Sequence, residues 1–145
     1  MINKIPEDDI LLKNCLAALK ENSIIIDREE AKEIWQTFKK NVPIIGSRID
    51  WSKINRKITI EFIDQTVSFL EKILNRSFDH SIYIMWNDAS LPMVKTSLEV
   101  AISKFDNIIP LGFEIWMYNP KEGYVIEYHY SEGIHAGSIQ LDNLD

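Results

Sequence analysis

The chain has 145 residues, of which 46% are hydrophobic and 26% are charged, and its net charge is −6. These values are ordinary for a soluble globular protein, so we expect one domain over residues 1–145, and the acidic balance argues against direct nucleic-acid binding. No apolar stretch is long enough to span a bilayer, and residues 1–13 lack the pattern of a secretory signal, so we expect a cytoplasmic protein.

The first half of the chain is predicted to be mainly helical. Residues 6–21 contain apolar residues at helical spacing, and Cys15 within them is expected to be a buried hydrophobe, because a lone cysteine cannot form an internal disulfide. Residues 27–40 form a second helix, because Asp27 is followed three residues later by Glu30 in a capping-box pattern.

The assignment is less clear between residues 41 and 75. Residues 41–57 are predicted to be a loop in which basic residues surround Trp51, and we expect this loop to be solvated with Trp51 packed inward. Contact of this basic cluster with phosphate is the alternative. Residues 59–75 show helical spacing, while apolar alternation at their start leaves a strand open there.

The second half of the chain is predicted to be rich in strands. Its expected strands are residues 81–86, 108–118, 124–130 and 134–141. A turn at residues 87–90 and a helix at residues 91–105 lie between the first two of them. We therefore predict an α+β fold, in which the N-terminal helices and one further helix pack on one face of a mainly antiparallel β-sheet with a C-terminal β-meander.

Alternation along the strands predicts which side chains share a face. We expect a four-residue loop, Asn119–Glu122, between the third and second last of these strands, so that Ile115 lies opposite Ile126 on the core face. The same register places Glu114 opposite Glu127, and we expect both carboxylates to be exposed. Like charges directly opposite each other destabilise a sheet, so such a pair suggests a face that a cationic partner covers.

A second hairpin is predicted to pair His129 with His135, with Gly133 in a left-handed turn. The outer face of the sheet would then display Glu114, Trp116, Glu127, His129 and His135. Two imidazoles and two carboxylates on neighbouring strands could hold zinc or iron, or perform acid/base chemistry. A small metal-dependent or acid/base enzyme is therefore the alternative to a binding protein, although no local metal-ligand spacing supports it.

All of the net charge lies in residues 76–145, which carry four basic and ten acidic residues, whereas residues 1–75 are neutral overall. The acidic half also contains Trp86, Trp116, Tyr118, Tyr124, Tyr128 and Tyr130. A field of one sign attracts a partner of the other sign, and aromatic side chains are enriched in protein interfaces. The sequence therefore indicates a surface that meets a basic partner.

Motifs in residues 80–140 resemble those of one protein family. They are the runs Trp86-Asn87-Asp88-Ala89-Ser90-Leu91-Pro92, Gly112-Phe113-Glu114-Ile115-Trp116, Gly123-Tyr124-Val125-Ile126-Glu127-Tyr128-His129-Tyr130 and Ile134-His135-Ala136-Gly137. The chain thereby resembles the immunity proteins of bacterial contact-dependent growth inhibition systems. The resemblance implies a non-enzymatic inhibitor that binds the C-terminal toxin domain of a contact-delivered effector, in many cases a nuclease, in the cytoplasm.

The resemblance supplies no transferable binding residues, because each immunity protein fits its own toxin. From charge and aromatic content we expect a 1:1 complex with a basic toxin domain, and we expect no cofactor, bound metal, nucleic acid or membrane partner. The candidate partner-binding residues are Asp88, Glu114, Trp116, Tyr118, Glu127, His129 and His135.

Overall fold

The computed structural model describes residues 7–139. Its α-helices are α1 (Glu7–Leu19), α2 (Arg28–Asn41), α3 (Thr66–Leu74), α4 (Leu98–Ser103) and α5 (Phe105–Ile108). Its 3-10 helices are η1 (Lys20–Asn22), η2 (Trp51–Lys53), η3 (Ile63–Gln65) and η4 (Ile109–Leu111). Its strands are β1 (Ile24–Ile25), β2 (Ile44–Ile45), β3 (Arg48–Ile49), β4 (Arg56–Ile60), β5 (Ser81–Trp86), β6 (Val94–Ser97), β7 (Glu114–Asn119), β8 (Tyr124–His129) and β9 (Gly133–Ser138).

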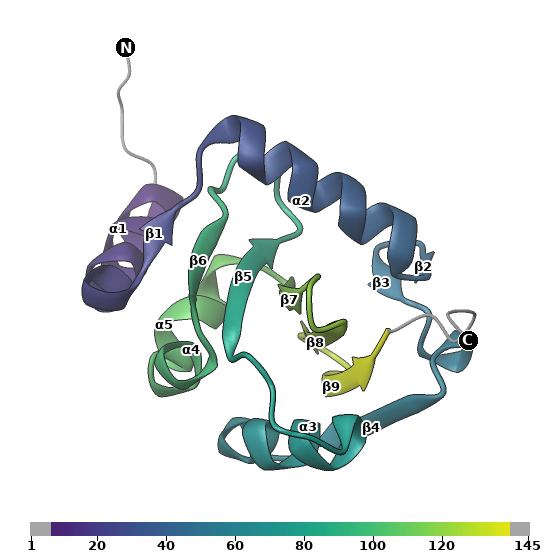
Figure 1. Cartoon of the computed structure of the whole chain (residues 1–145). Helices are drawn as coiled ribbons and strands as arrows, with labels where there is room; N and C mark the ends of the chain where they lie inside the picture. Colours follow the sequence, from purple (N-terminus) through teal and green to yellow (C-terminus); the bar gives the residue numbers. More distant parts are fainter. Residues whose placement is uncertain (1–6, 140–145) are drawn as a thin grey trace.

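Seven of the strands form one antiparallel sheet in the order β1-β6-β5-β7-β8-β9-β4, and β2 pairs with β3 as a separate small hairpin (Figure 1). The last three strands in the chain, β7, β8 and β9, are consecutive neighbours and form the expected C-terminal meander. These features confirm the predicted α+β fold.

One face of the sheet is covered by four helices. Cys15 and Leu19 of α1, Leu70 of α3, Leu98 of α4 and Phe105 of α5 belong to a single apolar core with the inward side chains of the strands. Figure 1 shows α1, α4 and α5 at the left and α3 at the bottom, beside β4. Cys15 is fully buried, as expected.

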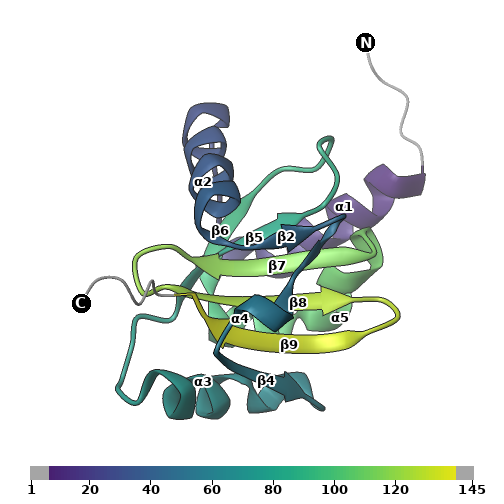
Figure 2. The ribbon, with the colours of Figure 1, turned by 90° about the vertical axis from the view of Figure 1, so that its right-hand side faces the viewer.

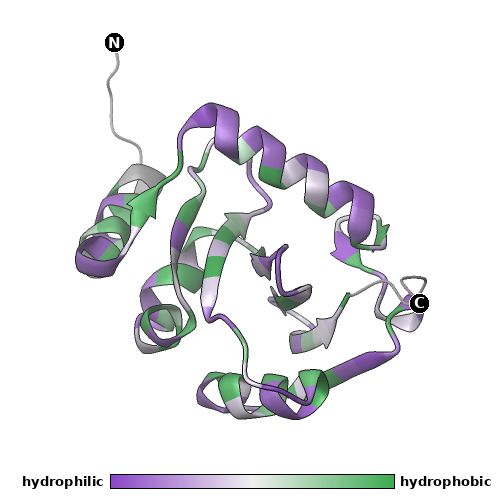
Figure 3. Ribbon diagram, viewed as in Figure 1, coloured by the Kyte–Doolittle hydropathy of each residue, from purple (hydrophilic) through white to green (hydrophobic). Residues whose placement is uncertain are grey.

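The other face of the sheet is covered by α2, which corrects the expectation that all helices lie on one face. Ala31, Ile34, Trp35 and Phe38 recur at helical spacing and belong to a second apolar core, which also contains Trp116 and other outward side chains of the strands. Figure 3 shows α2 as a mostly hydrophilic ribbon interrupted by apolar residues, as expected for a helix with one buried face. The sheet is therefore buried on both sides.

The start and end of α2 follow the sequence signals. The side chain of Asp27 accepts a hydrogen bond from the backbone N–H of Glu30 at 2.8 Å, which satisfies a free donor of the first turn. Lys39 and Lys40 lie in the last turn, where positive charge complements the helix dipole. The capping box is only half formed, because the Glu30 carboxylate instead accepts a hydrogen bond from the Tyr83 hydroxyl at 3.0 Å.

The prediction of one helix over residues 91–105 is wrong in its first part. Val94–Ser97 forms strand β6, which lies between β1 and β5. Val94 and Thr96 are buried and Lys95 is exposed, which is the alternation of a strand. Ser97 then caps α4 by accepting a hydrogen bond from the backbone N–H of Val100 at 3.2 Å.

Other boundaries also differ from the sequence-based expectations. The alternative of a strand before residue 61 is realised as β4, so the helix expected over residues 59–75 begins only at Thr66. The expected loop at 41–57 contains the β2–β3 hairpin and η2. Residues 108–111 are helical, and β7 begins at Glu114. The first residue of the helix expected over 6–21 and the last two of the strand expected over 134–141 lie outside the described residues.

Candidate functional site

Three loops meet at one end of the sheet. They are the loop that follows β5, the segment that precedes β7, and the turn between β8 and β9. Figure 2 shows the loop after β5 and the β8–β9 turn projecting from this end, together with the tip of the β2–β3 hairpin. We call the partly or fully exposed side chains here the sheet-end surface, and its residues are Asp88, Phe113, Glu114, Tyr130 and Glu132.

Glu114 connects two of these loops through its carboxylate. Its Oε1 accepts a hydrogen bond from Asn87 Nδ2 at 3.2 Å, and its Oε2 lies 3.4 Å from His129 Nε2. The backbone N–H of Ser131 donates to His129 Nδ1 at 3.2 Å, while Nε2 on the other side of the ring faces Glu114. These contacts fix the imidazole ring and hold Glu114 at the base of the surface.

Phe113 and Tyr130 form an exposed aromatic pair above this network. Their ring centroids are 5.0 Å apart, and the side chains are 69% and 62% exposed. A backbone hydrogen bond of 3.0 Å from Tyr130 N to Phe113 O holds the two residues together. The ring of His129 lies 4.9 Å from that of Tyr130. The pair is thus a fixed apolar contact surface rather than two independent side chains.

Two exposed carboxylates lie on the loops of this end. Asp88 accepts hydrogen bonds from the backbone N–H and the hydroxyl of Ser90, at 2.9 and 2.7 Å, and these bonds hold its pKa below the usual value. Glu132 lies in the β8–β9 turn and forms an ion pair of 3.5 Å with Arg48 of β3. The sheet-end surface therefore combines aromatic area with negative charge.

The predicted registers of both hairpins are wrong by two residues. Glu114 pairs with His129, not with Glu127, and Ile115 pairs with Tyr128, because Gly123 with φ of +80° completes a four-residue loop of residues 120–123. In the second hairpin Glu127, not His129, pairs with His135, and His129 pairs with Gly133. A shift of two keeps every side chain on its predicted face, so the face assignments survive the error.

The predicted exposure of that face is wrong for most of its residues. Trp116, Tyr118, Glu127 and His129 are 3%, 0%, 2% and 6% exposed. Phe38 of α2 covers the two aromatic residues, with ring centroids 5.1 Å from both Trp116 and Tyr118. Alternation along a strand identifies a face but does not reveal the helix that covers it.

Glu127 is a buried structural carboxylate. Its Oε2 accepts hydrogen bonds from the backbone N–H of Ile49 at 2.8 Å and from Trp116 Nε1 at 2.9 Å. Its Oε1 accepts a hydrogen bond from Trp51 Nε1 at 2.8 Å. Three donors satisfy the carboxylate, and they join β8 to the segment that follows β2. Glu127 is therefore not available to a partner.

His135 pairs with the buried Glu127 across β8 and β9 and does not reach Glu114 or His129. It is half-buried in β9, and its ring centroid is 5.7 Å from that of Trp51. Of the proposed site residues, the structure brings Glu114 and His129 together at the sheet-end surface and leaves Asp88 exposed nearby, whereas Trp116 and Glu127 meet in the buried part of the sheet. Over residues 7–139, with side chains described from residue 10 onwards, no group of three or more His, Cys, Asp or Glu side chains is arranged to hold a metal ion.

The exposure of Phe113 and Tyr130 was not predicted from the sequence. Alternation assigns Phe113 to the core face with Ile115, but the strand begins one residue later, at Glu114. Tyr130 precedes the turn residues Ser131-Glu132-Gly133, and this position next to a tight turn is the signal that could have identified it.

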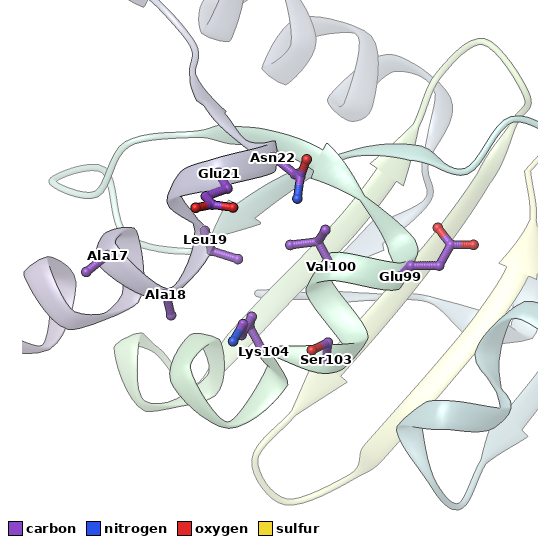
Figure 4. Close-up of a pocket in the computed structure, with 9 residues that line it drawn as sticks. All are labelled: Ala17, Ala18, Leu19, Glu21, Asn22, Glu99, Val100, Ser103 and Lys104. Carbon is purple, nitrogen blue, oxygen red and sulfur yellow. The ribbon is translucent and has the colours of Figure 1, made fainter.

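A separate cavity of about 480 Å³ lies between α1 and α4 (Figure 4). Its polar lining residues, among them Glu21, Glu99 and Lys104, are all exposed. No buried polar group points into it, so nothing there selects a ligand. No helix within residues 7–139 is long and apolar enough to cross a membrane.

Comparisons with known proteins identify the family. No curated protein is similar enough to the chain to count as a relative. A family model described as CdiI immunity protein, EcoliA0-like, matches residues 9–137. This match runs from within α1 to the last but one residue of β9, and it includes the N-terminal part that the motif resemblance left unassigned. The sheet with its loop-built end thus belongs to an inhibitor of a toxin, and the chain is a member of the EcoliA0-like family of CdiI immunity proteins.

Proposed function

We propose that the chain neutralises its cognate toxin domain by binding it through the sheet-end surface. The observation that carries this proposal is the exposed Phe113–Tyr130 pair, which is flanked by the carboxylates of Asp88 and Glu132. Exposed aromatic residues that are held in place lose little entropy on binding and act as anchors of interfaces. The carboxylate of Glu114 contacts Asn87 and His129, and its partly exposed side chain remains a candidate contact for the toxin domain.

The chemistry of the surface favours a basic partner. A nuclease neutralises phosphates with Lys and Arg side chains, so the cleft of a nuclease is basic. The net charge of −6 on this chain and the acids beside Phe113 complement such a cleft. We therefore propose a 1:1 complex with a basic nuclease domain in the cytoplasm, in which inhibition results from binding and not from turnover by this chain.

The experiment uses the toxin domain encoded next to this chain. Titration calorimetry gives the Kd for the wild type and for the variants Phe113→Ala and Tyr130→Ala, and a growth assay gives protection against the expressed toxin. We expect both variants to bind at least about tenfold more weakly, since loss of a central aromatic anchor typically costs 2 kcal/mol or more.

The matched control is Ile24→Ala on the edge strand β1. Ile24 is 64% exposed, similar to Tyr130, but it lies at the edge of the sheet opposite β4. We expect its Kd to equal that of the wild type. Wild-type affinity of both aromatic variants would show that the toxin binds elsewhere, and absence of binding by the wild type would contradict the proposed function itself.

A further inference from the structure

A strongly basic segment reaches the acidic sheet-end surface through the β2–β3 hairpin. Residues 39–57 contain six basic residues and one acidic residue, so their net charge is +5 in a chain whose total is −6. The segment includes the end of α2, the β2–β3 hairpin, η2 and the start of β4. We call its basic side chains, with the isoleucines of the hairpin, the basic hairpin face, and its residues are Lys39, Lys40, Ile44, Ile45, Arg48, Lys53, Arg56 and Lys57.

Most of these cations have no partner of opposite charge. Among the residues that the structure describes, Arg48 is the only one of the six in a side-chain ion pair. Lys57 Nζ donates to the backbone carbonyl of Trp51 at 2.9 Å, which leaves its charge uncompensated. Lys53 and Arg56 are exposed and form no side-chain hydrogen bond. The face therefore presents free positive charge.

The segment that carries this charge is fixed against the sheet. Glu127 binds the backbone of Ile49 and the indole of Trp51, and the N–H of Asp50 donates to the carbonyl of Pro43 at 2.8 Å. Gly137 of β9 allows the close approach of Trp51, because a Cβ there would lie 2.9 Å from the indole ring. A positioned set of charges binds with a smaller entropic cost than a mobile loop.

The hairpin part of the basic hairpin face adjoins the sheet-end surface, whereas Arg56 and Lys57 lie toward the other end of β9, opposite Ser138 and Gly137. Arg48 and Glu132 form the ion pair that joins the hairpin to the sheet-end surface, and both side chains remain partly exposed, at 41% and 49%. Ile45, at the tip of the hairpin, is 63% exposed, and Ile44 is 39% exposed. Figure 2 shows this tip at the same end of the sheet as the β8–β9 turn. One partner can therefore cover both surfaces.

We propose that the basic hairpin face is a second contact surface for the same toxin domain and that it receives an acidic patch with an apolar recess on that domain. This proposal rests on the proposed function above. The cations select carboxylates, and the exposed isoleucines select an apolar recess between them. Two neighbouring surfaces of opposite sign allow only one orientation of the partner, since the reversed orientation would bring like charges together.

A nucleic acid fits this face less well than a protein does. Basic proteins that bind single strands use free aromatic rings to stack bases. The Trp51 indole donates its N–H to Glu127, and its ring lies against His135, so it offers no free stacking surface. A phosphate backbone also offers no apolar surface for the exposed isoleucines of the hairpin to contact.

The test is a double charge reversal, Lys53→Glu with Arg56→Glu. The matched control is Lys13→Glu with Lys104→Glu, on α1 and at the end of α4, where both lysines are exposed. Both double variants change the net charge by the same amount, so the comparison isolates the position of the charge. We expect the first variant to bind the toxin domain at least tenfold more weakly, by calorimetry, and the control to bind like the wild type.

Equal affinities of the two double variants would overturn the proposal while leaving the proposed function intact, because the wild type would still bind. A second arm measures the fluorescence anisotropy of a labelled 20-nucleotide RNA with the isolated chain. RNA binding that is lost in Lys53→Glu with Arg56→Glu, together with unchanged toxin affinity, would reassign the face to nucleic acid. Weakened toxin binding without RNA binding supports the proposal.

Discussion

Glu127 shows how a single side chain can join two parts of a fold. Its carboxylate accepts three hydrogen bonds, two of them from the indoles of Trp51 and Trp116. A buried carboxylate is tolerated only where donors replace the lost water, and here the donors come from two separate segments. The residue therefore fixes the position of the basic hairpin face without touching a partner.

We expect Glu127→Gln to destabilise the protein. A glutamine has one acceptor oxygen, and its amide nitrogen would face an N–H that needs an acceptor. An unsatisfied buried donor costs roughly 1–3 kcal/mol, so urea unfolding followed by tryptophan fluorescence is expected to show a loss of that size. Glu132→Gln, in the exposed turn, serves as the control and is expected to change the unfolding free energy little. Equal stability of the two variants would show that the three hydrogen bonds contribute little.

Cys15 is an unreactive thiol in the folded protein. Burial raises the pKa of its thiol from 9.0 to about 11. We expect almost no reaction with a thiol reagent at pH 8 until urea unfolds the chain, because both the access of the reagent and the thiolate fraction are low. Rapid labelling of the native protein would mean that α1 detaches from the sheet.

The same shift predicts a pH dependence of stability. Below pH 9 the thiol is protonated in both states, and between pH 9 and about 11 only the unfolded state loses the proton. The free energy of unfolding therefore falls over this window. We expect a shallower fall in Cys15→Ala, which lacks this titration, when urea unfolding is measured across the window for both proteins. Identical slopes would contradict a raised pKa.

At the scale of elements, the contact between η2 and β9 depends on a glycine. A Cβ on Gly137 would lie 2.8 Å from the carbonyl oxygen of Arg56 and 2.9 Å from the ring of Trp51. We expect Gly137→Ala to move η2 away from β9 and to lower the unfolding free energy by about 1–3 kcal/mol, the usual cost of overpacking. The emission of Trp51 is expected to shift as its ring becomes more exposed.

Gly112→Ala is the matched control for this substitution. A Cβ there would meet only Trp86 at 3.4 Å and the carbonyl of Glu114 at 3.8 Å, and its backbone is extended. We expect a much smaller loss of stability. A loss equal to that of Gly137→Ala would mean that β9 can shift to accept a methyl group.

The elements also show what the sequence could and could not reveal. Asp27 and Glu30 predict the start of α2, because a cap acts over three residues. The segment 94–97 was misassigned because its apolar residues fit both the period of a helix and the short alternation of a strand. Pairing with β5 on one side and with β1 on the other decided the outcome, and β1 lies about seventy positions earlier in the chain. The burial of Trp116 likewise depends on α2, which lies some eighty positions earlier.

At the scale of the whole molecule, the charge distribution is expected to steer association. With a basic toxin domain, the association rate constant should fall steeply with added salt, because the Debye length shrinks from about 10 Å at 0.1 M to about 3 Å at 1 M. Stopped-flow measurement at several salt concentrations checks this. Phe113→Ala serves as the comparison and is expected to raise the dissociation rate instead. An association rate that does not change with salt would contradict steering by charge.

The order of the strands has a consequence for incomplete chains. Strand β4 pairs only with β9, and Trp51 finds its carboxylate only on β8, so the early part of the chain depends on the last part. A ribosome delivers the N-terminal part first, and contacts between distant residues form late. We therefore expect a half-made chain to give no protection. A chain that stops before β8 lacks both the carboxylate that Trp51 binds and the strand that pairs with β4, so truncation anywhere before the meander is expected to abolish folding rather than to leave a smaller working inhibitor.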